Sequence, residues 1–571
     1  LAPAAAPAPT IARSDAVLEA EHAVHPVRAA SGMVATQKAE ATAIGLDVLA
    51  RGGNAVDAAV AVAFALAVVL PRAGNLGGGG FLLYHDAADG TTAALDYRER
   101  APAAAHADLF LDANGDVDEE LARYSRKAAG VPGTVAGFAA LHRRHGSLPW
   151  ASLLAPAIRL AREGFPLSHD AVDNLARRLD RFASHLSTVD AFLMRDPASG
   201  APQVPAVGAI LRQPDLAWSL EQIAQGGEKA FYDGPIAARL VADMAAHDGL
   251  ITQEDLRAYR PVWRAPVRGV YRGHEVLSMP PPSSGGVHLI QMLNVLEGFD
   301  LASMGAGSAA AIHHMAETMK LAYADRSLHL GDPDFWDVPI AGLTARPYAD
   351  ALRRQIDPAR ARPARDIAPG RPAAYESPDT THFSIVDGAG NAISNTYTLN
   401  FSYGSGIVAE GTGFLLNNQM DDFAAKPGVP NGYGLLGGAA NAVEAGKRPL
   451  SSMTPTIVLK DDAPFLLTGS PGGSRIITTV LQILINVIDH DMTIAEATYA
   501  PRMHHQWLPD HIRIEPRGFS PDTLRLLMAM GHTIEISDVM GSTQSILRQD
   551  DGTWHGCSDA RRPDALTRGH D

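Results

Sequence analysis

Residues 379–387 read Asp-Thr-Thr-His-Phe-Ser-Ile-Val-Asp and place two threonines at the entrance of a predicted strand. Apolar and polar residues alternate over 382–387, the sequence Gly-Ala-Gly-Asn at 388–391 is typical of a turn, and the alternation resumes over 392–399. This pattern predicts a β-hairpin. With a loop of about three to five residues, its register places Thr380 opposite Thr398, Leu399 or Asn400.

Thr380 is a candidate nucleophile because of its place in this hairpin. A threonine hydroxyl needs an adjacent base to take its proton, and the α-amine of an N-terminal threonine is one such base. That amine exists here only if the bond between Asp379 and Thr380 is broken. An ordinary hairpin, with β-branched residues suited to strands, explains this segment alone equally well.

A glycine-rich loop supplies the second candidate element. Gly-Ser-Pro-Gly-Gly-Ser at 469–474 leads into an apolar stretch, 475–488, that is long enough for a buried helix. Backbone N–H groups at a helix N-terminus bind negative charge, and no Lys-Ser/Thr pair follows at the spacing of a phosphate loop. The N–H groups of Gly472 and Gly473 are therefore predicted to form an oxyanion hole, with a tight turn that needs positive φ as the alternative.

The glycine run at 77–80 has a different expected role. It precedes the apolar strand predicted at 81–84, whereas a dinucleotide-binding fingerprint follows a strand and opens a helix. We therefore reject a Rossmann fold and expect close backbone packing at these glycines.

The composition excludes several classes of protein. A net charge of -15 provides no positive surface for phosphates, which argues against a nucleic-acid partner. The apolar run at 58–70 is too short to span a bilayer and predicts a buried helix, so no membrane span is expected. Cys557 is the single cysteine, which excludes an intrachain disulfide. The 571 residues equal about two to four ordinary domains in length, yet no low-complexity linker divides them.

No cofactor and no catalytic metal are expected. The adjacent pairs His313-His314 and His504-His505 would point their side chains apart on a helix or a strand, which disfavours ligation by both members. The stretch Asp-Ala-Asn-Gly-Asp at 112–116 is similar to a calcium loop, but its glycine is misplaced for an EF-hand, and Asn-Gly is typical of a hairpin turn.

Nine segments, in one order along the chain, carry a resemblance to a known family. They lie at 32–35, 52–59, 74–80, 97–99 (Tyr-Arg-Glu), 130–133, 380–382 (Thr-Thr-His), 417–423, 448–453 and 469–474. On these segments the chain resembles the γ-glutamyltranspeptidases (glutathione hydrolases), which are members of the N-terminal nucleophile (Ntn) hydrolase superfamily, and in particular their bacterial periplasmic type. The likeness runs from about residue 25 to the C-terminus.

The resemblance implies a mixed α/β (α+β) fold, the Ntn-hydrolase αββα sandwich, in which two stacked and mainly antiparallel sheets are flanked by helices. Residues 1–24 would be a flexible leader. Autocleavage between Asp379 and Thr380 would then give a large subunit (25–379) and a small catalytic subunit (380–571) that form a heterodimer and one αββα unit. Related enzymes often carry a neutral side chain before the nucleophile, so the rate of maturation with Asp379 stays open. The Ala/Pro-rich opening is expected of an exported mature protein, periplasmic or secreted.

Carried over residue by residue, the resemblance makes Thr380 both the autoprocessing residue and the nucleophile, with Thr398 hydrogen-bonded to it. The γ-glutamyl group would be held as a zwitterion, since a guanidinium suits a carboxylate and a carboxylate suits an ammonium. Its α-carboxylate would contact Arg98, Ser451 and Ser452, and its α-ammonium would contact Asn400, Gln419 and Asp422. Taken singly, these residues have simpler explanations: Arg98 fits a surface ion pair, Asp422 fits a turn or cap, and Ser451 and Ser452 fit ordinary loop residues.

The segment 427–438 is rich in proline and glycine and carries one aromatic residue, Tyr433, a composition that favours an exposed loop. It resembles the lid that covers the glutamyl pocket in many of these enzymes. Relatives that act on cephalosporins or poly-γ-glutamate tend to lack this lid.

The expected activity is a two-step acyl transfer. Thr380 would attack the γ-glutamyl amide of glutathione or a related compound, and the acyl group would pass to water, an amino acid or a dipeptide. Two alternatives remain open: a cephalosporin acylase or poly-γ-glutamate hydrolase of the same fold, which the lid-like loop disfavours, and an unprocessed chain that binds γ-glutamyl compounds without turnover.

Overall fold

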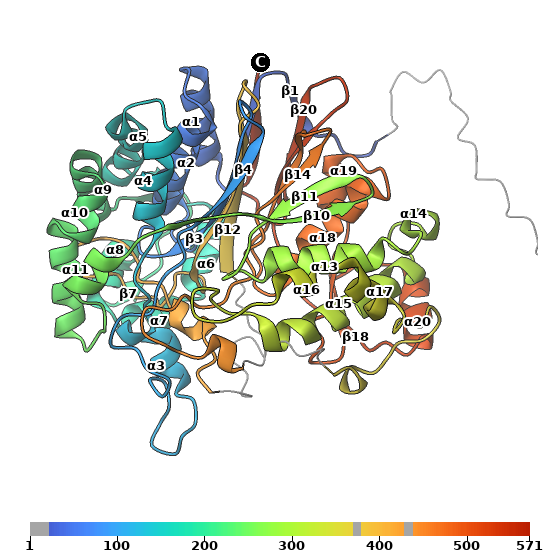
Figure 1. The fold of residues 1–571 in the computed structure, drawn as a ribbon. Helices are drawn as coiled ribbons and strands as arrows, with labels where there is room; N and C mark the ends of the chain where they lie inside the picture. The colour runs from blue at the N-terminus through green and yellow to red at the C-terminus, as the bar shows by residue number, and fades with distance from the viewer. Residues whose placement is uncertain (1–21, 369–378, 427–437) are drawn as a thin grey trace, which may run out of the picture.

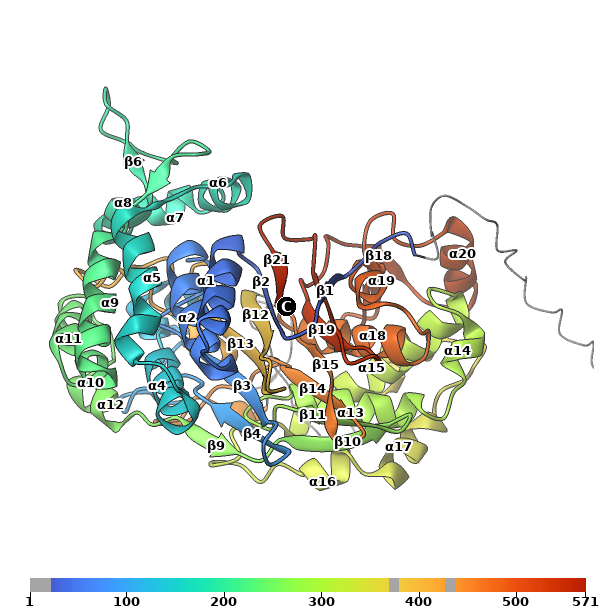
Figure 2. The ribbon, with the colours of Figure 1, turned by 90° about the horizontal axis from the view of Figure 1, so that it is seen from above.

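Two stacked seven-stranded sheets between two layers of helices make up the computed structural model, which describes residues 22–368, 379–426 and 438–571 (Figure 1). Seen from above, the order across the molecule is helices, sheet, sheet, helices (Figure 2). Neighbouring strands are antiparallel throughout both large sheets. The expected αββα sandwich is confirmed.

Both large sheets mix strands from the two sides of residue 379. The sheet that contains the threonine hairpin has the order β21(Leu566–His570), β2(Gly32–Thr36), β12(Asp379–Val386), β13(Ala392–Asn400), β3(Gly79–Asp86), β4(Thr91–Asp96), β9(Val262–Arg264). The facing sheet has the order β1(Val27–Ala29), β20(Trp554–Ser558), β19(Gln544–Arg548), β15(Ala463–Thr468), β14(Thr456–Lys460), β11(His274–Ser278), β10(Val267–Tyr271). Backbone hydrogen bonds therefore join the parts of the chain before and after residue 379 within each sheet.

The core between the sheets follows from the two-residue period of a strand. In β3, Phe81 and Leu83 enter the space between the sheets, whereas Leu82 packs toward the helices on the other face. In β14, Ile457 enters the same inner core and Val458 faces the opposite helical layer. Each sheet is thus buried on both faces.

The helical layer over the hairpin sheet comes from residues before 260. It contains α1(Ala39–Ala50), α2(Ala55–Val69), α4(Thr134–His145), α5(Trp150–Glu163) and α9(Pro214–Gly226), with shorter helices around them: α3(Glu119–Tyr124), α6(His169–Ala176), α7(Leu179–Ala183), α8(Leu186–Phe192), α10(Glu228–Tyr232), α11(Pro235–Ala246) and α12(Gln253–Ala258).

The opposite helical layer combines residues from both sides of 379. It contains α13(Gly285–Leu296), α15(Ala309–His329), α18(Arg475–Ile488) and α19(Ile494–Tyr499), with α14(Leu301–Met304), α16(Ile340–Leu343), α17(Arg346–Arg353) and α20(Pro521–Ala529) at the periphery. The small strands are β5(Phe165–Pro166), β6(Met194–Arg195), β7(Pro202–Gln203), β8(Ile210–Leu211), β16(Met503–His504), β17(Ile512–Ile514) and β18(Ile534–Ile536).

Helix α2 is the buried helix that the apolar run at 58–70 predicts, and every one of its residues is buried. Asn54 caps its N-terminus, and Asp57 completes a reciprocal capping box. The buried Asp57 carboxylate also accepts hydrogen bonds from Ser147 N–H and Leu148 N–H, so its charge is satisfied although it is out of water. Among the described residues, no helix combines the length and apolar composition that a bilayer crossing requires.

The glycine run at 77–80 allows the close backbone packing that the sequence predicts. A Cβ atom on Gly78 would lie 2.1 Å from the carbonyl oxygen of Thr398, and one on Gly80 would lie 2.5 Å from that of Thr396. Side chains at these positions would push β3 away from β13, which carries Thr398. The Asn-Gly turn near residue 114 is also confirmed, since Gly115 has a φ of 78° and Leu111 bridges Val117.

Candidate active site

The predicted hairpin is present and brings the two threonine hydroxyls together. Thr381 pairs with Tyr397 and Asp379 pairs with Asn400, with a register irregularity between them at Thr380. The Thr380 hydroxyl donates to the Thr398 hydroxyl oxygen at 3.4 Å. A bulge next to a reactive group is a common way to re-aim a side chain.

Eight of the predicted site residues line one pocket at the end of this hairpin. Its lining consists of Arg98, Thr380, Thr398, Asn400, Gln419, Asp422, Ser451, Ser452, Met453 and Ile476. These residues come from the end of β4, from β12 and β13, from the 3-10 turn η3(Gln419–Asp422), from the segment before β14 and from the first turn of α18. Local sequence patterns do not identify Met453 and Ile476 as lining residues, because neither apolar side chain carries a chemical signal of its own.

Three buried acceptor oxygens face no donor among the described residues. They are Asn400 Oδ1, Gln419 Oε1 and Asp422 Oδ1. The remaining polar atoms of these three side chains have hydrogen-bond partners. Asn400 Nδ2 donates to the Asn418 carbonyl at 2.9 Å, and Gln419 Nε2 donates to Asp422 Oδ2 at 2.5 Å. Because a buried acceptor without a donor costs free energy, this set is suited to a ligand that carries several N–H donors.

Arg98 lies beside these acceptors and is almost fully buried, at 1% exposure. Its Nη2 donates to Asp422 Oδ2 and to the Leu450 carbonyl at 2.8 Å, and its Nε donates to the Pro449 carbonyl at 3.1 Å. Arg98 therefore forms a buried ion pair, not a surface one. The two carbonyls hold the guanidinium plane in a defined orientation.

The carboxylates around Arg98 have raised pKa values. Burial raises the pKa of Asp422, and the neighbouring Arg98 guanidinium partly opposes this shift. Burial raises the pKa of Glu99 to about 8, although Arg98 again lowers it. Glu99 thus holds its proton at neutral pH, and the positive charge of Arg98 is balanced by one carboxylate. Such a pocket is suited to a ligand whose own charges cancel.

Ser451 and Ser452 lie in a segment that is tied to the N-terminus of α13. The Ser284 N–H donates to the Ser451 carbonyl at 2.7 Å, and the Ser451 N–H donates to the Pro282 carbonyl at 2.8 Å. Arg326, on α15, donates through Nη2 to the Ser452 hydroxyl oxygen at 3.3 Å. Sequence reasoning missed Arg326, because nothing near it in the chain indicates a contact with Ser452.

Gly472 and Gly473 have positive φ angles of 136° and 61°, immediately before α18. Neither N–H group donates a backbone hydrogen bond within the described part of the chain. Both glycines lie outside the pocket lining, which is reached by Ile476 in the first turn of α18. The tight turn with positive φ, which is the alternative to an oxyanion hole, is present. Because it leaves both N–H groups without a backbone acceptor in the described chain, the turn and an oxyanion hole are compatible.

His382 follows the threonine pair and has a structural position. Its Nδ1 lies 2.8 Å from the Thr396 hydroxyl and its Nε2 lies 3.0 Å from the Ser384 hydroxyl. Burial lowers the pKa of His382 to about 3, so the ring is neutral. Gly469 packs against this ring, since a Cβ atom there would lie 2.4 Å from it. His382 therefore connects β12 to the glycine-rich loop.

Tyr433 lies outside the described residues, as does the rest of the lid-like segment at 427–437. The ends of this segment are joined at its base, where the Ala424 N–H donates to the Asn441 carbonyl at 2.8 Å. The buried Asn441 side chain also donates to the Asp422 carbonyl at 2.6 Å and accepts from the Leu450 N–H at 3.0 Å. The base of the segment is thus hydrogen-bonded to the backbone of Asp422, which lines the pocket.

Two groups of side chains among the described residues have the composition and spacing to hold a metal ion. They are His313, Glu317 and His532, which are buried, and Asp243, His247 and Glu410, of which the last two are exposed. Neither group includes a residue of the candidate active site.

Comparison with known proteins agrees with this geometry. The model of the family described as gamma-glutamyltranspeptidase matches residues 41–568. A glutathione hydrolase proenzyme of Escherichia coli (strain K12) is 52% identical over 569 residues, which cover 100% of this chain and 96% of that protein.

Two solved structures are also similar. A cephalosporin acylase from Bacillus halodurans has a TM-score of 0.85 at 28% identity, covering 98% of this chain and 100% of the other. A chain of Helicobacter pylori gamma-glutamyltranspeptidase has a TM-score of 0.56 at 44% identity, covering 58% of this chain and 93% of the other.

Proposed function

The chain belongs to the γ-glutamyltranspeptidase family, and from this membership we propose how the pocket around Thr380 carries out the family's reaction. The enzyme cleaves the γ-glutamyl amide bond of glutathione and related compounds and transfers the acyl group to water or to an amine. The observation that carries the residue assignments is the set of buried oxygens on Asn400, Gln419 and Asp422, which face no donor from the described part of the chain.

These three oxygens are the proposed contacts of the substrate α-ammonium, which has three N–H bonds to donate. Arg98, together with Ser451 and Ser452, binds the α-carboxylate. The Arg98–Asp422 ion pair supports this arrangement, because an amino-acid zwitterion presents the complementary pair of charges and leaves the net charge of the pocket unchanged. The γ-carbonyl of the bound substrate then lies toward Thr380, which lines the same pocket.

Maturation comes first. Thr380 Oγ1 attacks the carbonyl carbon of Asp379, the C–N bond between the two residues breaks, and the resulting ester is hydrolysed by water. The products are the Asp379 carboxylate and the free α-amine of Thr380. The register irregularity between Asp379 and Thr381 supports this step, because the hydroxyl and its own preceding carbonyl must approach each other closely. The products form a heterodimer in which the large subunit is 25–379 and the small subunit is 380–571. The segment 1–24 is the proposed leader before the large subunit.

Acyl transfer then uses the released amine as the base. The amine takes the proton of Thr380 Oγ1, and the oxygen attacks the γ-carbonyl carbon. Gly472 and Gly473 donate their N–H groups to the oxyanion, and Thr398 holds the nucleophile by its hydroxyl. Collapse breaks the amide C–N bond, and the leaving amine takes the proton. Water, an amino acid or a dipeptide then attacks the γ-glutamyl ester and regenerates Thr380.

The segment around Tyr433 serves as the lid in this proposal. A closed lid limits the access of water to the acyl-enzyme and gives an acceptor amine a place to bind. The alternative activity as a cephalosporin acylase shares the fold, and the similarity to the Bacillus halodurans enzyme is therefore expected. The 52% identity to a glutathione hydrolase supports the γ-glutamyl reaction. We propose that the enzyme is located in the periplasm or outside the cell. Fractionation of cells that produce the enzyme tests this location.

The decisive experiment replaces Thr380 by alanine and follows maturation by denaturing gel and mass spectrometry. Thr380→Ala is expected to remain one chain without activity toward a chromogenic γ-glutamyl anilide, because both steps need the hydroxyl. Thr380→Ser is expected to mature more slowly, because its hydroxyl persists.

The matched control is Thr381→Val, which alters the next threonine, outside the pocket lining, and is expected to mature. Two subunits from Thr380→Ala would reject the assignment of Thr380. An unprocessed but ligand-binding wild-type chain would instead support the non-enzymatic alternative.

A further inference from the structure

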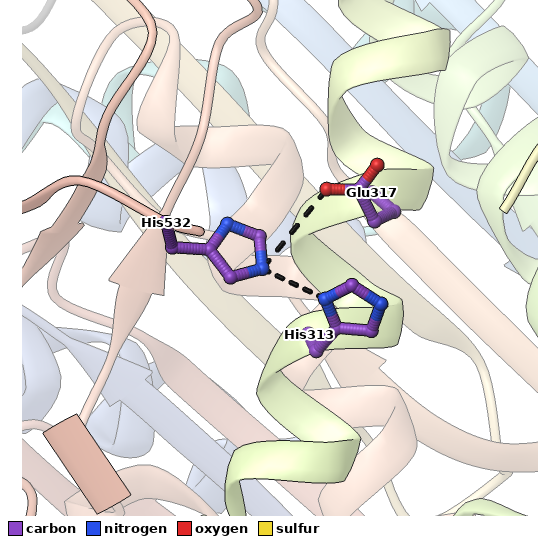
Figure 3. A group of neighbouring side chains, drawn as sticks. All are labelled: His313, Glu317 and His532. Atoms are coloured by element: carbon purple, nitrogen blue, oxygen red, sulfur yellow. Dashed lines mark hydrogen bonds and ion pairs between the residues drawn. The ribbon is translucent and has the colours of Figure 1, made fainter. Parts of the chain in front are cut away.

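His313, Glu317 and His532 form a buried cluster on the side of the molecule where α15 meets α20. Their relative exposures are 0%, 2% and 7%. His313 and Glu317 lie four residues apart on one face of α15, and His532 lies between α20 and β18 (Figure 3). His313 Nδ1 is 2.8 Å from His532 Nε2, and His532 Nε2 is 4.0 Å from Glu317 Oε1. One ligand atom from each residue lies within 4.8 Å of the others.

The tautomer of His313 is set by its second nitrogen. His313 Nε2 lies 2.7 Å from the Asp357 carbonyl oxygen, which only accepts, so Nε2 carries the hydrogen. In the neutral ring, Nδ1 then has a lone pair that points toward His532 and Glu317. A histidine that donates its other N–H to a backbone carbonyl is the usual arrangement around a bound metal ion.

Both rings are buried, and each turns one nitrogen toward the other. Neutral imidazole is the form that binds a metal. Two imidazoles and one carboxylate in a protein interior are a ligand set typical of zinc, with a fourth position for water.

We propose that His313, Glu317 and His532 form a site for a divalent transition-metal ion, with Zn²⁺ as the ion that this ligand set favours. The ion would bind His313 Nδ1, His532 Nε2 and Glu317 Oε1. On binding, His532 changes tautomer: the proton on Nε2, which is donated to His313 Nδ1 in the empty site, is released to solvent, and Nδ1 takes up a proton from solvent. Both rings then stay neutral, and the two facing lone pairs become ligands.

Lys320 is the competitor of the metal ion. Its Nζ lies 2.5 Å from Glu317 Oε1 and also donates to the Arg362 carbonyl. Metal binding requires the ammonium to give up Oε1 and to keep the Arg362 carbonyl as its acceptor. The Glu317 carboxylate keeps a second hydrogen bond, from the Arg362 N–H to Oε2 at 3.2 Å, which holds it in place when Lys320 moves.

The site lies away from the proposed reaction. Arg326, which contacts Ser452 of the pocket, is thirteen residues further along α15 than His313. At about 1.5 Å per residue, this places the metal site about 20 Å from that contact along the helix. His313 and Glu317 precede the proposed cleavage point and His532 follows it, so the ion would join the two subunits. This joining role rests on the proposed cleavage, whereas metal binding itself does not.

The test measures metal binding by the full chain produced without a histidine tag. After removal of metal with a chelator, the mature enzyme is expected to bind one equivalent of Zn²⁺, and Co²⁺ is expected to give the intense visible absorption of a tetrahedral site. His313→Gln and His532→Gln retain hydrogen-bonding groups and are each expected to weaken Zn²⁺ binding by more than about tenfold. Lys320→Gln is expected to tighten binding, because it removes the competing ammonium.

The matched control is His314→Gln. His314 is the neighbour of His313, but it faces Phe299, and its Nδ1 lies 2.8 Å from the Ala310 carbonyl oxygen. Its variant is expected to bind Zn²⁺ as the wild type does. Zn²⁺ is further expected to raise the melting temperature of the wild type but not of His532→Gln, with unchanged γ-glutamyl anilide activity in both.

Two results would overturn the proposal. One is the absence of stoichiometric Zn²⁺ or Co²⁺ binding by the chelator-treated wild type. The other is equal binding by the wild type and both ligand variants, which would locate the ion elsewhere. Zn²⁺ titration of the uncleaved Thr380→Ala chain separates this proposal from the proposed function, because the three ligands are present whether or not the chain is cut.

Discussion

At the scale of single residues, the pocket is organised by buried polar groups that are only partly satisfied. Asp422 accepts from Arg98 and from Gln419 through one oxygen, while its second oxygen faces no donor in the described chain. Arg98 is oriented by two backbone carbonyls. Groups held in this way lose little freedom when a substrate binds, which favours affinity.

Arg98→Lys tests whether the planar guanidinium group is needed at this position. The guanidinium uses three of its five N–H bonds on Asp422 and the two carbonyls and keeps two for the substrate carboxylate. An ammonium has only three N–H bonds and cannot make all of these contacts at once. We expect kcat/KM for γ-glutamyl donors to fall by about tenfold to a hundredfold, which corresponds to the roughly 1.5–3 kcal/mol of a charge-assisted contact, while maturation stays intact.

The control for this prediction is Arg100→Lys, which makes the same change two residues away. Arg100 donates to the Gly446 carbonyl at 2.7 Å and does not line the pocket. A mature Arg98→Lys enzyme with the KM of the wild type would remove Arg98 from the substrate site.

At the scale of elements, the position of β12 depends on its contact with the glycine-rich loop. The His382 ring is held by hydroxyl groups of β12 and β13 on one side and packs against Gly469 on the other. Because Thr380 is two residues before His382 on the same face of β12, a shift of the ring also moves the proposed nucleophile.

Gly469→Ala tests this contact. The added methyl group would lie 2.4 Å from ring atoms that have hydrogen bonds to lose. We expect a loss of stability of about 1–3 kcal/mol, as for other overpacked core sites, together with slower maturation. Thermal unfolding and a gel time course measure the two effects. Gly342→Ala is the control, since a Cβ atom there meets nothing within 4 Å. Equal melting temperatures and equal maturation rates of the two variants would mean that the contact between Gly469 and His382 does not fix the position of β12.

The lid-like segment offers a second test at this scale. Its base is closed by the Ala424–Ala442 bridge and by Asn441, so the tip around Tyr433 can be deleted without separating the two ends. We expect the deletion to change the ratio of transfer to hydrolysis more than it changes acylation, because the proposed oxyanion donors and zwitterion contacts lie outside the segment.

The measurement for the deletion is transfer of the γ-glutamyl group to glycylglycine against its hydrolysis, at one donor concentration. An unchanged ratio, with normal maturation, would mean that the segment is not a lid and would favour the acylase alternative.

At the scale of the whole molecule, the two proposed subunits share both sheets. In the hairpin sheet, β12 pairs with β2 on one side and with β13 on the other, and β13 pairs in turn with β3. In the facing sheet, β14 pairs with β11 and β20 pairs with β1. Cleavage of one peptide bond breaks none of these ladders.

We therefore expect the cleaved enzyme to elute as a single species under native conditions and to give two bands, with a length ratio of about two to one, on a denaturing gel. The two fragments produced separately are expected to fail to fold alone, because each would expose unpaired strand edges and half of a core. Two independently folded fragments, seen by circular dichroism and cooperative melting, would contradict this prediction.

The local elements follow from the sequence by itself. Alternation and turn residues predict the hairpin of β12 and β13 and a register that places Thr380 opposite Thr398, Leu399 or Asn400, and the apolar runs predict the buried helices α2 and α18. These features are readable because side-chain period and turn chemistry act between residues that are near in the chain. The resemblance adds the residues of the pocket and the hydrogen bond between Thr380 and Thr398, but not the hydrogen bonds that hold Arg98, Asn400 and Gln419.

Only the tertiary structure decided which distant groups meet. The buried pairing of Arg98 with Asp422, the contact of Arg326 with Ser452 and the cluster of His313 with His532 each join residues from different elements. Single-sequence patterns do not encode these contacts, because they depend on how the two sheets exchange strands and how the helical layers pack on them. The side chains of His313 and His314 diverge on α15, as the helical period predicts. Only the packing of α15 against the segment after α20 brings His532 to His313.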